Sequence, residues 1–304
     1  MTKPLLAIVG PTAVGKSGLA LKLAQKLDGE IVNADSRQVY RYMEIGTAKP
    51  SSTEQTIVPH HLYDIVDPDE EFSLALYRDM ACRIIGDIQK RSKPPLLVGG
   101  SGQYVWSILE GWNIPEVPPD YQLRKELEAR AEREGGDILF RELQGFDSEA
   151  ASKIDPRNVR RVIRALEVCL TTGRRFSELR KKTPPDYDIQ IIGLTADRDE
   201  LYRRIDERVD WMVQNGFVEE VSALLDRGYT LDLSAMSSLG YREIGEFLGG
   251  EMDLTEACQQ IKYATHKYAR HQYSWFRLGD ERIRWFDSSL EQAEILAQIE
   301  TNLP

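Results

Sequence analysis

Cysteine and long apolar runs are both scarce in this chain of 304 residues. The three cysteines, Cys82, Cys169 and Cys258, are odd in number and far apart, which argues against a disulfide framework or a structural zinc site and is typical of reduced thiols in a cytosolic protein. No stretch reaches the roughly 18 apolar residues that a membrane-spanning helix needs, and no cleavable leader precedes the first predicted strand. We therefore expect a cytoplasmic protein with no membrane segment.

Positive charge is also in short supply, since 39 Lys and Arg face 49 Asp and Glu and the formal net charge is −10. Taken alone, this balance argues against a nucleic-acid partner, because phosphate backbones are bound by clustered Lys and Arg. One segment is an exception to this excess of acidic residues. From Lys153 to Lys182 the chain has ten Lys or Arg against three acids, a local net charge of +7.

Within that segment, the pattern predicts a helix that Asp155-Pro156 opens, with apolar residues on one face. The opposite face carries a stripe of four arginines: Arg157, Arg160, Arg161 and Arg164. A solvated face is the alternative, but such faces normally mix charges of both signs. Since like charges repel unless an anion neutralises them, the stripe indicates a surface for phosphates.

The segment GPTAVGKS follows an apolar run and leads into an amphipathic stretch. It matches GxxxxGK[ST] at every fixed position, in the strand–loop–helix context that the motif requires. Backbone N–H groups of such a loop hold a phosphate or diphosphate, Lys16 would reach the phosphate oxygens and the Ser17 hydroxyl would bind Mg²⁺. A glycine-containing turn that binds nothing is the alternative. We predict an anion site formed by Gly10, Pro11, Thr12, Ala13, Val14, Gly15, Lys16 and Ser17.

Two further strands should bring polar residues to the same sheet edge. The strand at 30–33 leads to Asp35, and the strand at 95–98 leads to the glycine-rich turn that contains Ser101. In open α/β sheets, ligand-binding residues collect at the carboxyl ends of the strands. We therefore expect Asp35 to face the phosphate loop, whereas Ser101 either joins the site or caps the next helix.

Proline-rich segments at Asn113–Tyr121 and Thr183–Tyr187 mark two boundaries, and Ile189–Leu194 has the pattern of a returning strand. The predicted fold class is α/β, a P-loop NTPase-like core with a parallel sheet flanked by helices, plus a mainly α-helical insertion. We expect the core in residues 1–113 and 189–304 and the insertion in residues 114–188.

Residues 43–50 and 58–64 are predicted to form ordered loops over the crevice. The second loop contains His60 and His61; adjacent histidines in an extended segment point to opposite sides, so one packed and one exposed side chain is a better interpretation than a metal site. Basic and aromatic residues interleave from Lys262 to Arg277. They could contact nucleic acid, although aromatics at helical spacing more often pack in a core.

Read in order, these motifs resemble the tRNA dimethylallyltransferase family, also called tRNA isopentenyltransferases, of bacterial type. The resemblance covers nearly the whole chain and is carried by GPTAVGKS, NADSRQVYRYMEIGTAKP, VPHHLYD, PLLVGGSGQY, NVRRVIRALEV, LYRRIDERVDWMVQNGFVEEV, SSLGYREI and RHQYSWFR. It implies transfer of a dimethylallyl group from dimethylallyl diphosphate to the exocyclic amino group of the adenosine 3′-adjacent to the anticodon. It also implies release of diphosphate, a requirement for Mg²⁺, and a tRNA anticodon stem-loop as partner.

The resemblance further implies roles for individual residues. Asp35, Lys16 and Ser101 would be catalytic, Arg208 would join the phosphate loop in binding diphosphate, and Ser17 would bind the metal. Contacts with tRNA would come from Asp35, Ser36, Arg37, Gln38, Ser101, Arg124, Arg160, Arg161, Val162, Ile163 and Arg164. The chain departs from the family at Ser101 and Gln103, where GGTGLY is usual, and at Arg270-His271, where Lys-Arg is usual.

Three other functions compete with this one. An adenylate isopentenyltransferase would prenylate a free nucleotide, which needs no arginine stripe. A P-loop nucleotide or small-molecule kinase would share the α/β core. A non-enzymatic RNA-binding protein would show tRNA affinity without turnover. We expect the enzyme to act as a monomer.

Overall fold

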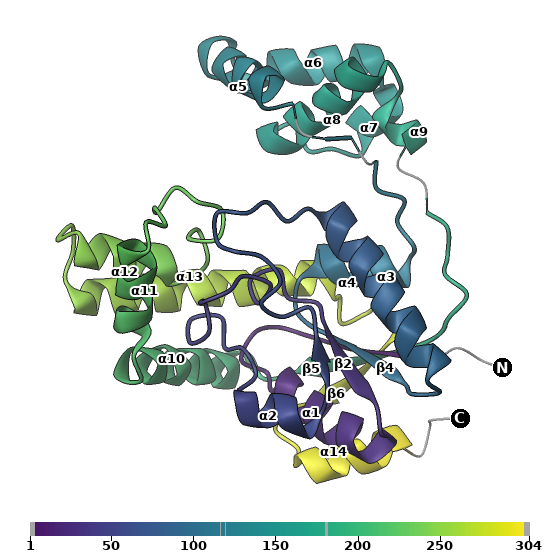
Figure 1. Ribbon diagram of the computed structural model, residues 1–304. Coiled ribbons are helices and arrows are strands. Elements are labelled where there is room, and N and C mark those ends of the chain that lie inside the picture. The colour runs from purple at the N-terminus through teal and green to yellow at the C-terminus, as the bar shows by residue number, and fades with distance from the viewer. Residues whose placement is uncertain (1–3, 116, 119, 180–181, 301–304) are drawn as a thin grey trace. The chain divides into compact units, whose positions relative to one another are not determined.

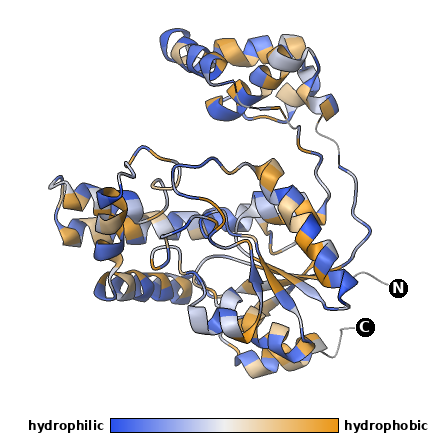
Figure 2. Ribbon diagram, in the orientation of Figure 1, coloured by the Kyte–Doolittle hydropathy of each residue, from blue (hydrophilic) through white to orange (hydrophobic). Residues whose placement is uncertain are grey.

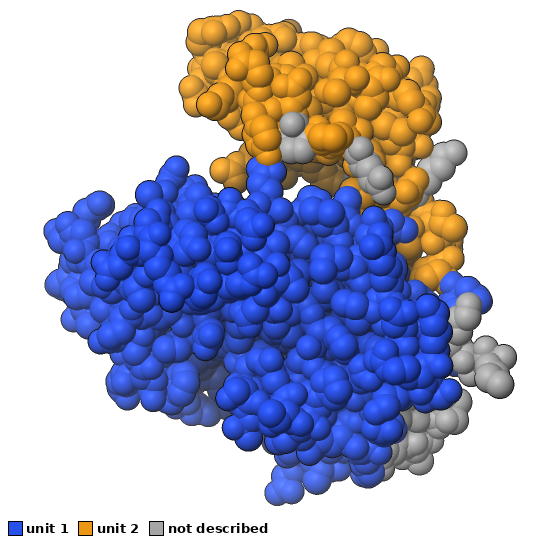
Figure 3. All heavy atoms as spheres, viewed as in Figure 1, with its two compact units in different colours: residues 1–108, 186–304 blue, residues 109–185 orange. Residues whose placement is uncertain are grey.

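The computed structural model of the chain describes residues 4–115, 117–118, 120–179 and 182–300. The chain divides into two compact units, a core unit of residues 1–108 and 186–304 and a helical unit of residues 109–185 (Figure 3). The helical unit begins and ends slightly before the expected 114–188. Gly111 O accepts a hydrogen bond of 2.8 Å from Thr183 N, and Trp112 bridges to Lys182 in antiparallel fashion, so these flanking residues belong to the helical unit.

The core unit is built on a six-stranded sheet in which every pair is parallel, with the order β3-β2-β4-β1-β5-β6. The strands are β1 (Pro4–Val9), β2 (Glu30–Asn33), β3 (His60–His61), β4 (Pro95–Val98), β5 (Asp188–Thr195) and β6 (Ile283–Asp287). The α/β fold class is confirmed. The loop expected at 58–64 contains β3, because His60 and His61 pair with β2 at the sheet edge.

Helices cover both faces of this sheet (Figure 1). The helices of the core unit are α1 (Lys16–Leu27), α2 (Ser52–Ile57), α3 (Leu74–Lys90), α4 (Gly102–Leu109), α10 (Arg198–Gln214), α11 (Phe217–Asp226), α12 (Tyr241–Leu248), α13 (Leu254–Trp275) and α14 (Gln292–Glu300). Leu6 and Ile8 of β1 share one hydrophobic cluster with residues of α1 and α14. The alternate β1 residues are equally buried and, by strand alternation, face the side that α3 covers. Figure 2 shows the strands as mostly hydrophobic, as expected of a parallel sheet covered on both faces.

The helical unit consists of α5 (Tyr121–Glu134), α6 (Gly136–Phe146), α7 (Ser148–Ser152), α8 (Val159–Thr172) and α9 (Phe176–Leu179). It has its own core, in which Leu139 and Leu143 of α6 pack with Val162 and Leu166 of α8. In the described part of the chain, no helix combines the length and hydrophobicity needed to cross a bilayer.

The start of α8 corrects the predicted arginine stripe. The helix begins at Val159, where the Asn158 side chain accepts a hydrogen bond of 3.2 Å from Arg161 N, and not at Pro156. Asp155 accepts hydrogen bonds from the backbone N–H and side chain of Arg157 and forms a turn before the helix. Because this local turn competes with the helix, Arg157 lies outside α8 and is paired with Asp155.

Candidate functional site at the sheet edge

The phosphate loop joins β1 to α1, and its two fixed glycines serve different purposes. Gly10 has φ 141° and lies so close to β5 that a Cβ there would be 2.3 Å from Leu194 O. Gly15 has φ 94° and open space around it, directly before α1. The first backbone N–H groups of α1 have no intrahelical acceptor, so the loop presents donors and a helix N-terminus to an anion.

Lys16 and Ser17 open α1. Lys16 Nζ donates a hydrogen bond of 2.6 Å to Pro11 O within the loop. Burial lowers the pKa of Lys16 to about 8, the nearby Asp35 carboxylate opposes that change, and the Arg208 guanidinium adds to it. The Ser17 side chain is exposed and makes no hydrogen bond with another described residue.

Gln272 of α13 fastens the phosphate loop to the second glycine-rich turn. Its Oε1 accepts a hydrogen bond of 2.8 Å from Thr12 N, and its Nε2 donates one of 3.0 Å to Gly100 O. The residue is 3% exposed, and a Cβ on Gly100 would lie 2.2 Å from its Nε2. Thr12 was expected to bind phosphate, but its N–H is already used by Gln272.

Asp35 lies just beyond β2 in a rigid turn. Its N–H donates to Asn33 Oδ1 at 2.8 Å, and the Asn33 side chain donates in turn to Asp35 O at 3.0 Å and Leu62 O at 2.9 Å. One carboxylate oxygen accepts a hydrogen bond of 2.9 Å from Arg37 N. Asp35 interacts electrostatically with Lys16 and Arg208, so the structure brings the predicted base and phosphate-binding cations together.

Ser101 follows β4 and binds the segment next to Asp35. Its Oγ accepts a hydrogen bond of 2.9 Å from Ser36 N and donates one of 3.3 Å to Ser36 Oγ. Tyr268 of α13 also interacts with Ser101, and burial raises the pKa of this tyrosine well above its usual value. The hydroxyl therefore connects two strand ends and α13, and is not engaged as a helix cap.

These elements enclose a cavity of 320 Å³ in the core unit, at the small end of the range for ligand sites. Its polar side is formed by Thr12, Asp35, Ser36, Arg37 and Arg208. Its apolar side is formed by Ile205, Val209, Met212, Phe217 and Ile261.

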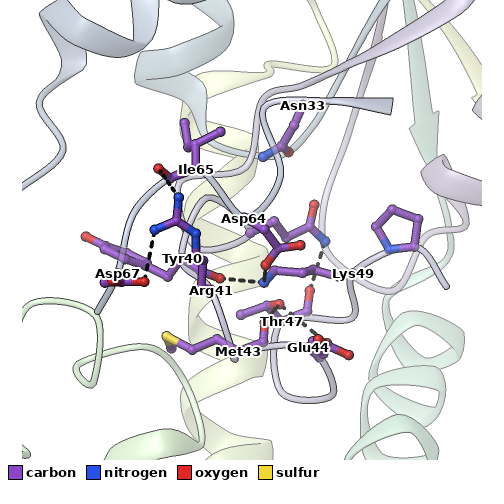
Figure 4. Close-up of polar contacts among 12 residues, drawn as sticks. Asn33, Tyr40, Arg41, Met43, Glu44, Thr47, Lys49, Asp64, Ile65 and Asp67 are labelled. Carbon is purple, nitrogen blue, oxygen red and sulfur yellow. Dashed lines mark hydrogen bonds and ion pairs between the residues drawn. The ribbon is translucent and has the colours of Figure 1, made fainter. Parts of the chain in front are cut away.

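The loop expected at residues 43–50 forms part of the cavity wall, and polar contacts of Lys49 and Arg41 hold it and the residues around it in place (Figure 4). Lys49 Nζ bonds to Tyr40 O and to the Asp64 carboxylate. Arg41 donates to Asp67 at 3.0 Å and to Ile65 O at 3.2 Å.

Glu220 of α11 holds the same loop from the other side. Its carboxylate accepts hydrogen bonds from the backbone N–H groups of Glu44, Ile45 and Gly46 at 2.9, 2.7 and 3.2 Å, and from Tyr241 at 2.6 Å. Three converging amides normally favour a bound anion, and here the Glu220 carboxylate is that anion. Sequence reasoning did not find this role, since the partners are far apart in the chain.

Two of the expected tRNA contacts are engaged within the core unit. Gln38 Nε2 donates to Thr47 O at 2.9 Å and Ala48 O at 3.0 Å, so its side-chain donor is directed into the loop. Arg37 donates to Ser234 O at 2.7 Å but still lines the cavity.

The expected RNA-binding residues of the helical unit divide into two groups. Arg124 and Arg164 donate to the fully buried Glu167 at 2.9 and 2.6 Å. Arg160 is exposed and Arg161 half-buried, and neither side chain has a partner among the described residues. Two of the counted basic residues, Arg180 and Lys181, lie outside the described residues.

Val162 and Ile163 correct the predicted contact segment. They are 0% and 3% exposed and pack in the core of the helical unit. Their side chains therefore position α8, and no side-chain contact with RNA is assigned to them.

His60 and His61 both have partners within the core unit. His60 Nδ1 lies 2.7 Å from Val58 O, whereas His61 Nε2 lies 2.7 Å from the buried Glu30 carboxylate. Both rings are half-buried, so the expectation of one exposed ring was wrong, although the two do point to different partners.

Most of the basic-aromatic segment belongs to α13, which pairs with α10. Lys262 and His266 lie 2.6 and 2.9 Å from the carboxylates of Asp210 and Asp206. Tyr263, by contrast, is 70% exposed. Much of the positive charge therefore joins two helices of the core unit.

Comparison with known proteins places this geometry in a family. The family model described as IPP transferase matches residues 38–279, and one described as isopentenyl transferase matches residues 3–59. A tRNA dimethylallyltransferase of Thermomicrobium roseum is 53% identical over 285 residues, covering 94% of this chain and 86% of that protein. One of Roseiflexus castenholzii is 55% identical over 274 residues, covering 90% of each.

Solved structures agree with the sequence relatives. The tRNA isopentenylpyrophosphate transferase of Bacillus halodurans has a TM-score of 0.74 at 41% identity, covering 99% of this chain and 95% of that one. A eukaryotic dimethylallyltransferase acting on tRNA has a TM-score of 0.82 at 27% identity, covering 100% and 81%. These names support the tRNA enzyme over the free-nucleotide enzyme and the kinase. The chain belongs to the IPP transferase family of tRNA dimethylallyltransferases.

Proposed function

We propose that this protein transfers a dimethylallyl group from dimethylallyl diphosphate to the exocyclic amino nitrogen of the adenosine 3′-adjacent to the anticodon in tRNA. One observation carries the proposal: Asp35 and Arg208 line a cavity that also has an apolar wall, and Lys16 interacts electrostatically with both of them. The arrangement suits a donor with an anionic head and a hydrocarbon tail, and an acceptor that must lose a proton.

The leaving group is diphosphate, and the phosphate loop is its binding site. As the bond between allylic carbon and phosphate oxygen breaks, the electron pair leaves with the oxygen. Lys16, Arg208 and the amides at the start of α1 offset this negative charge where it develops. The pKa of Arg208 is lowered by burial and raised by Asp35, yet a guanidinium keeps its charge at any physiological pH.

Asp35 is the proposed general base. An adenine amino nitrogen is a poor nucleophile, and it must lose a proton as the new carbon–nitrogen bond forms. Because the hydrogen bond that Asp35 N donates to Asn33 and the one that the carboxylate accepts from Arg37 N fix the turn around Asp35, the carboxylate is preorganised to accept that proton. The adenosine must be unstacked from the RNA to reach it.

Mg²⁺ fits this site as an ion carried mainly by the diphosphate. The Ser17 hydroxyl is exposed at the start of α1 and unused by the described residues. Magnesium usually retains several waters and takes few protein ligands when substrate phosphates bind it. Ser17 would supply one oxygen ligand, and the ion would neutralise charge on the leaving group.

The tRNA is proposed to bind through Arg160 and Arg161 of the helical unit, and through Ser36 and Arg37 at the cavity with Ser101 beside Ser36. Arginines without internal partners are available for phosphate contacts. All of these residues come from one chain, so we propose that a monomer is active. The cytoplasmic location remains a prediction.

The test is incubation of the purified protein with dimethylallyl diphosphate, Mg²⁺ and a tRNA anticodon stem-loop that contains an adenosine run. Nucleoside digestion should then release prenylated adenosine. AMP in place of RNA distinguishes the free-nucleotide enzyme, and labelled ATP with small acceptors distinguishes a kinase. Absence of prenylated nucleoside with the stem-loop would reject the proposal.

A further inference from the structure

The apolar part of the cavity lies between two antiparallel helices whose register is fixed by side-chain pairs. Along α10 and α13, Lys262 pairs with Asp210, His266 pairs with Asp206 and stacks on Tyr202, and Arg270 bonds to Tyr202. Because each step forward on one helix is matched by a step back on the other, Ile261 lies near the level of Met212, and Tyr268 near the level of Ile205.

Each helix lines the cavity with residues at i, i+4 and i+7, namely Ile205, Val209 and Met212 on α10 and Ile261, Thr265 and Tyr268 on α13. Tyr268 interacts with Ser101 and so marks the reacting end. Thr265 Oγ1 donates a hydrogen bond of 2.7 Å to Ile261 O, which satisfies its donor. The side chains that α10 and α13 contribute at the Ile261 end, Val209, Met212 and Ile261, are apolar, while Thr47, Ser237 and Ser238 of other segments also line the cavity.

Phe217, at the start of α11, also lines the cavity and packs closely against two glycines. A Cβ on Gly46 would lie 2.3 Å from its ring, and a Cβ on Gly240 would lie 2.7 Å from it. That same Cβ on Gly240 would lie 3.7 Å from Ile261 Cδ1, so Phe217 is beside the apolar end. Met212, Phe217 and Ile261 are 6%, 1% and 3% exposed and form a buried end wall.

We propose that this end wall limits donor chain length, admitting a five-carbon allylic tail and excluding a ten-carbon one. The inference rests on the proposed function. From Tyr268 to Ile261 the helix advances seven residues, about 10 Å at 1.5 Å per residue, and side chains occupy part of that length. A tail without polar groups loses nothing by burial among Val209, Met212 and Ile261, whereas a second prenyl unit would collide with Met212 and Phe217.

The experiment compares dimethylallyl and geranyl diphosphate as donors for the wild-type protein and Met212→Ala. Truncation of Met212 opens the end wall without touching the polar side. We expect the ratio of kcat/KM for geranyl to that for dimethylallyl diphosphate to rise at least tenfold, since a single methylene in an apolar pocket changes selectivity by about 10- to 200-fold. Leu201→Ala is the matched control, because Leu201 is a buried α10 residue, 3% exposed, that does not line the cavity.

A second variant, Met212→Phe, adds bulk at the same place and is read by binding alone. Titration should show dimethylallyl diphosphate binding at least tenfold more weakly, with inorganic diphosphate affinity within twofold of wild type. The inference would be overturned if folded Met212→Ala kept the wild-type ratio of kcat/KM for geranyl to dimethylallyl diphosphate. It would also be overturned if Met212→Phe weakened the binding of dimethylallyl diphosphate and inorganic diphosphate equally, or if the variants changed RNA affinity and not donor selectivity. If the wild type makes no prenyl-adenosine, the proposed function fails, while the two titrations still test the end wall.

Discussion

Asp35 is held by backbone hydrogen bonds with Asn33, and an asparagine in its place keeps an Oδ1 that can accept from Arg37 N, so the charge can be removed without loosening the turn. Asp35→Asn should lower turnover by about 10²- to 10⁴-fold, the contribution of a positioned general base. Inorganic diphosphate should bind no more weakly, because the change removes a negative charge near the anion. Single-turnover prenyl transfer and diphosphate titration measure the two effects.

Asp28→Asn is the control for this substitution, since the Asp28 side chain is 83% exposed and pairs only with Lys93 among the described residues. Turnover that stays at the wild-type level in Asp35→Asn would show that another group takes the proton.

Lys16 makes the donor site sensitive to pH. Its pKa is lowered to about 8, so the free enzyme loses the ammonium charge as the pH rises through that value and keeps it below. We expect kcat/KM for the donor to fall about tenfold per pH unit above about pH 8. A bound diphosphate should favour the charged form, so kcat should fall at a higher pH than kcat/KM.

The pH profile of kcat/KM for Lys16→Arg is the control for this prediction. A guanidinium stays charged throughout this range, so the fall near pH 8 should disappear even if the variant is slower. A fall at the same pH in Lys16→Arg would assign the titration to a different group.

At the scale of elements, Gln272 connects α13 to two loops that approach each other only in the folded chain. Gln272→Met keeps the shape but leaves Thr12 N–H and Gly100 O without their partner, which should cost about 1–3 kcal/mol of folding free energy. The phosphate loop should also be less well ordered, so donor affinity should fall. Denaturant unfolding and diphosphate titration measure these changes.

Gln260→Met on the exposed face of the same helix is the control and should alter neither quantity. If Gln272→Met binds diphosphate as tightly as the wild type, Gln272 does not position the loop.

Helix α8 presents Arg160 and Arg161 as basic groups with no described partner. The double variant Arg160→Ala/Arg161→Ala should reduce the slope of log affinity against log salt for tRNA by about one unit for each phosphate that the protein no longer neutralises. Lys22→Ala/Lys90→Ala removes the same charge from the core unit and should leave the slope nearly unchanged. If the arginine variant and the wild type showed the same slope, Arg160 and Arg161 would make no phosphate contacts and would only face solvent.

The elements that sequence reasoning predicted well are those whose pattern is local. β1 and β4 are short apolar runs that begin with proline and end before glycine, β2 directly follows Gly29, and the structure places strands at the predicted positions. The start of α8 was misplaced because Asp155 and Asn158 each offer a hydrogen-bonded turn, and only the geometry shows that Asn158 is the cap.

Contacts between distant residues could not be predicted in the same way. Gln272 and Thr12 are 260 residues apart, and nothing in the segment RHQYSWFR distinguishes the glutamine from its neighbours. The charge count around α8 likewise could not show that Glu167 neutralises Arg164 and Arg124, because the count weighs a buried acid and an exposed one equally.

At the scale of the whole molecule, a substitution at Glu167 tests whether the two units are energetically independent. It is fully buried and accepts hydrogen bonds from Asp120 N, Arg124 and Arg164 at 2.7, 2.9 and 2.6 Å. Glu167→Gln should destabilise the helical unit by about 3 kcal/mol, the low end for a broken buried pair, because both arginines remain a third exposed. Binding of tRNA should weaken while inorganic diphosphate affinity stays within twofold.

Glu134→Gln is the control, because Glu134 is 41% exposed on α5 of the same unit. An equal loss of diphosphate and tRNA affinity in Glu167→Gln would mean that the two units are not energetically separate.

The hydrogen bond between Thr183 N and Gly111 O has a consequence for folding. Bringing the ends of a long flexible loop together costs entropy, which grows by about 0.6 kcal/mol for each doubling of its length. Here the helices between those ends have a hydrophobic core of their own, and their folding brings the ends together. Once the helical unit has folded, the inserted residues act like a short connection between the part of the chain that contains β4 and the part that contains β5. Bringing both strands into the sheet then costs less loop-closure entropy than a flexible insertion of the same length would.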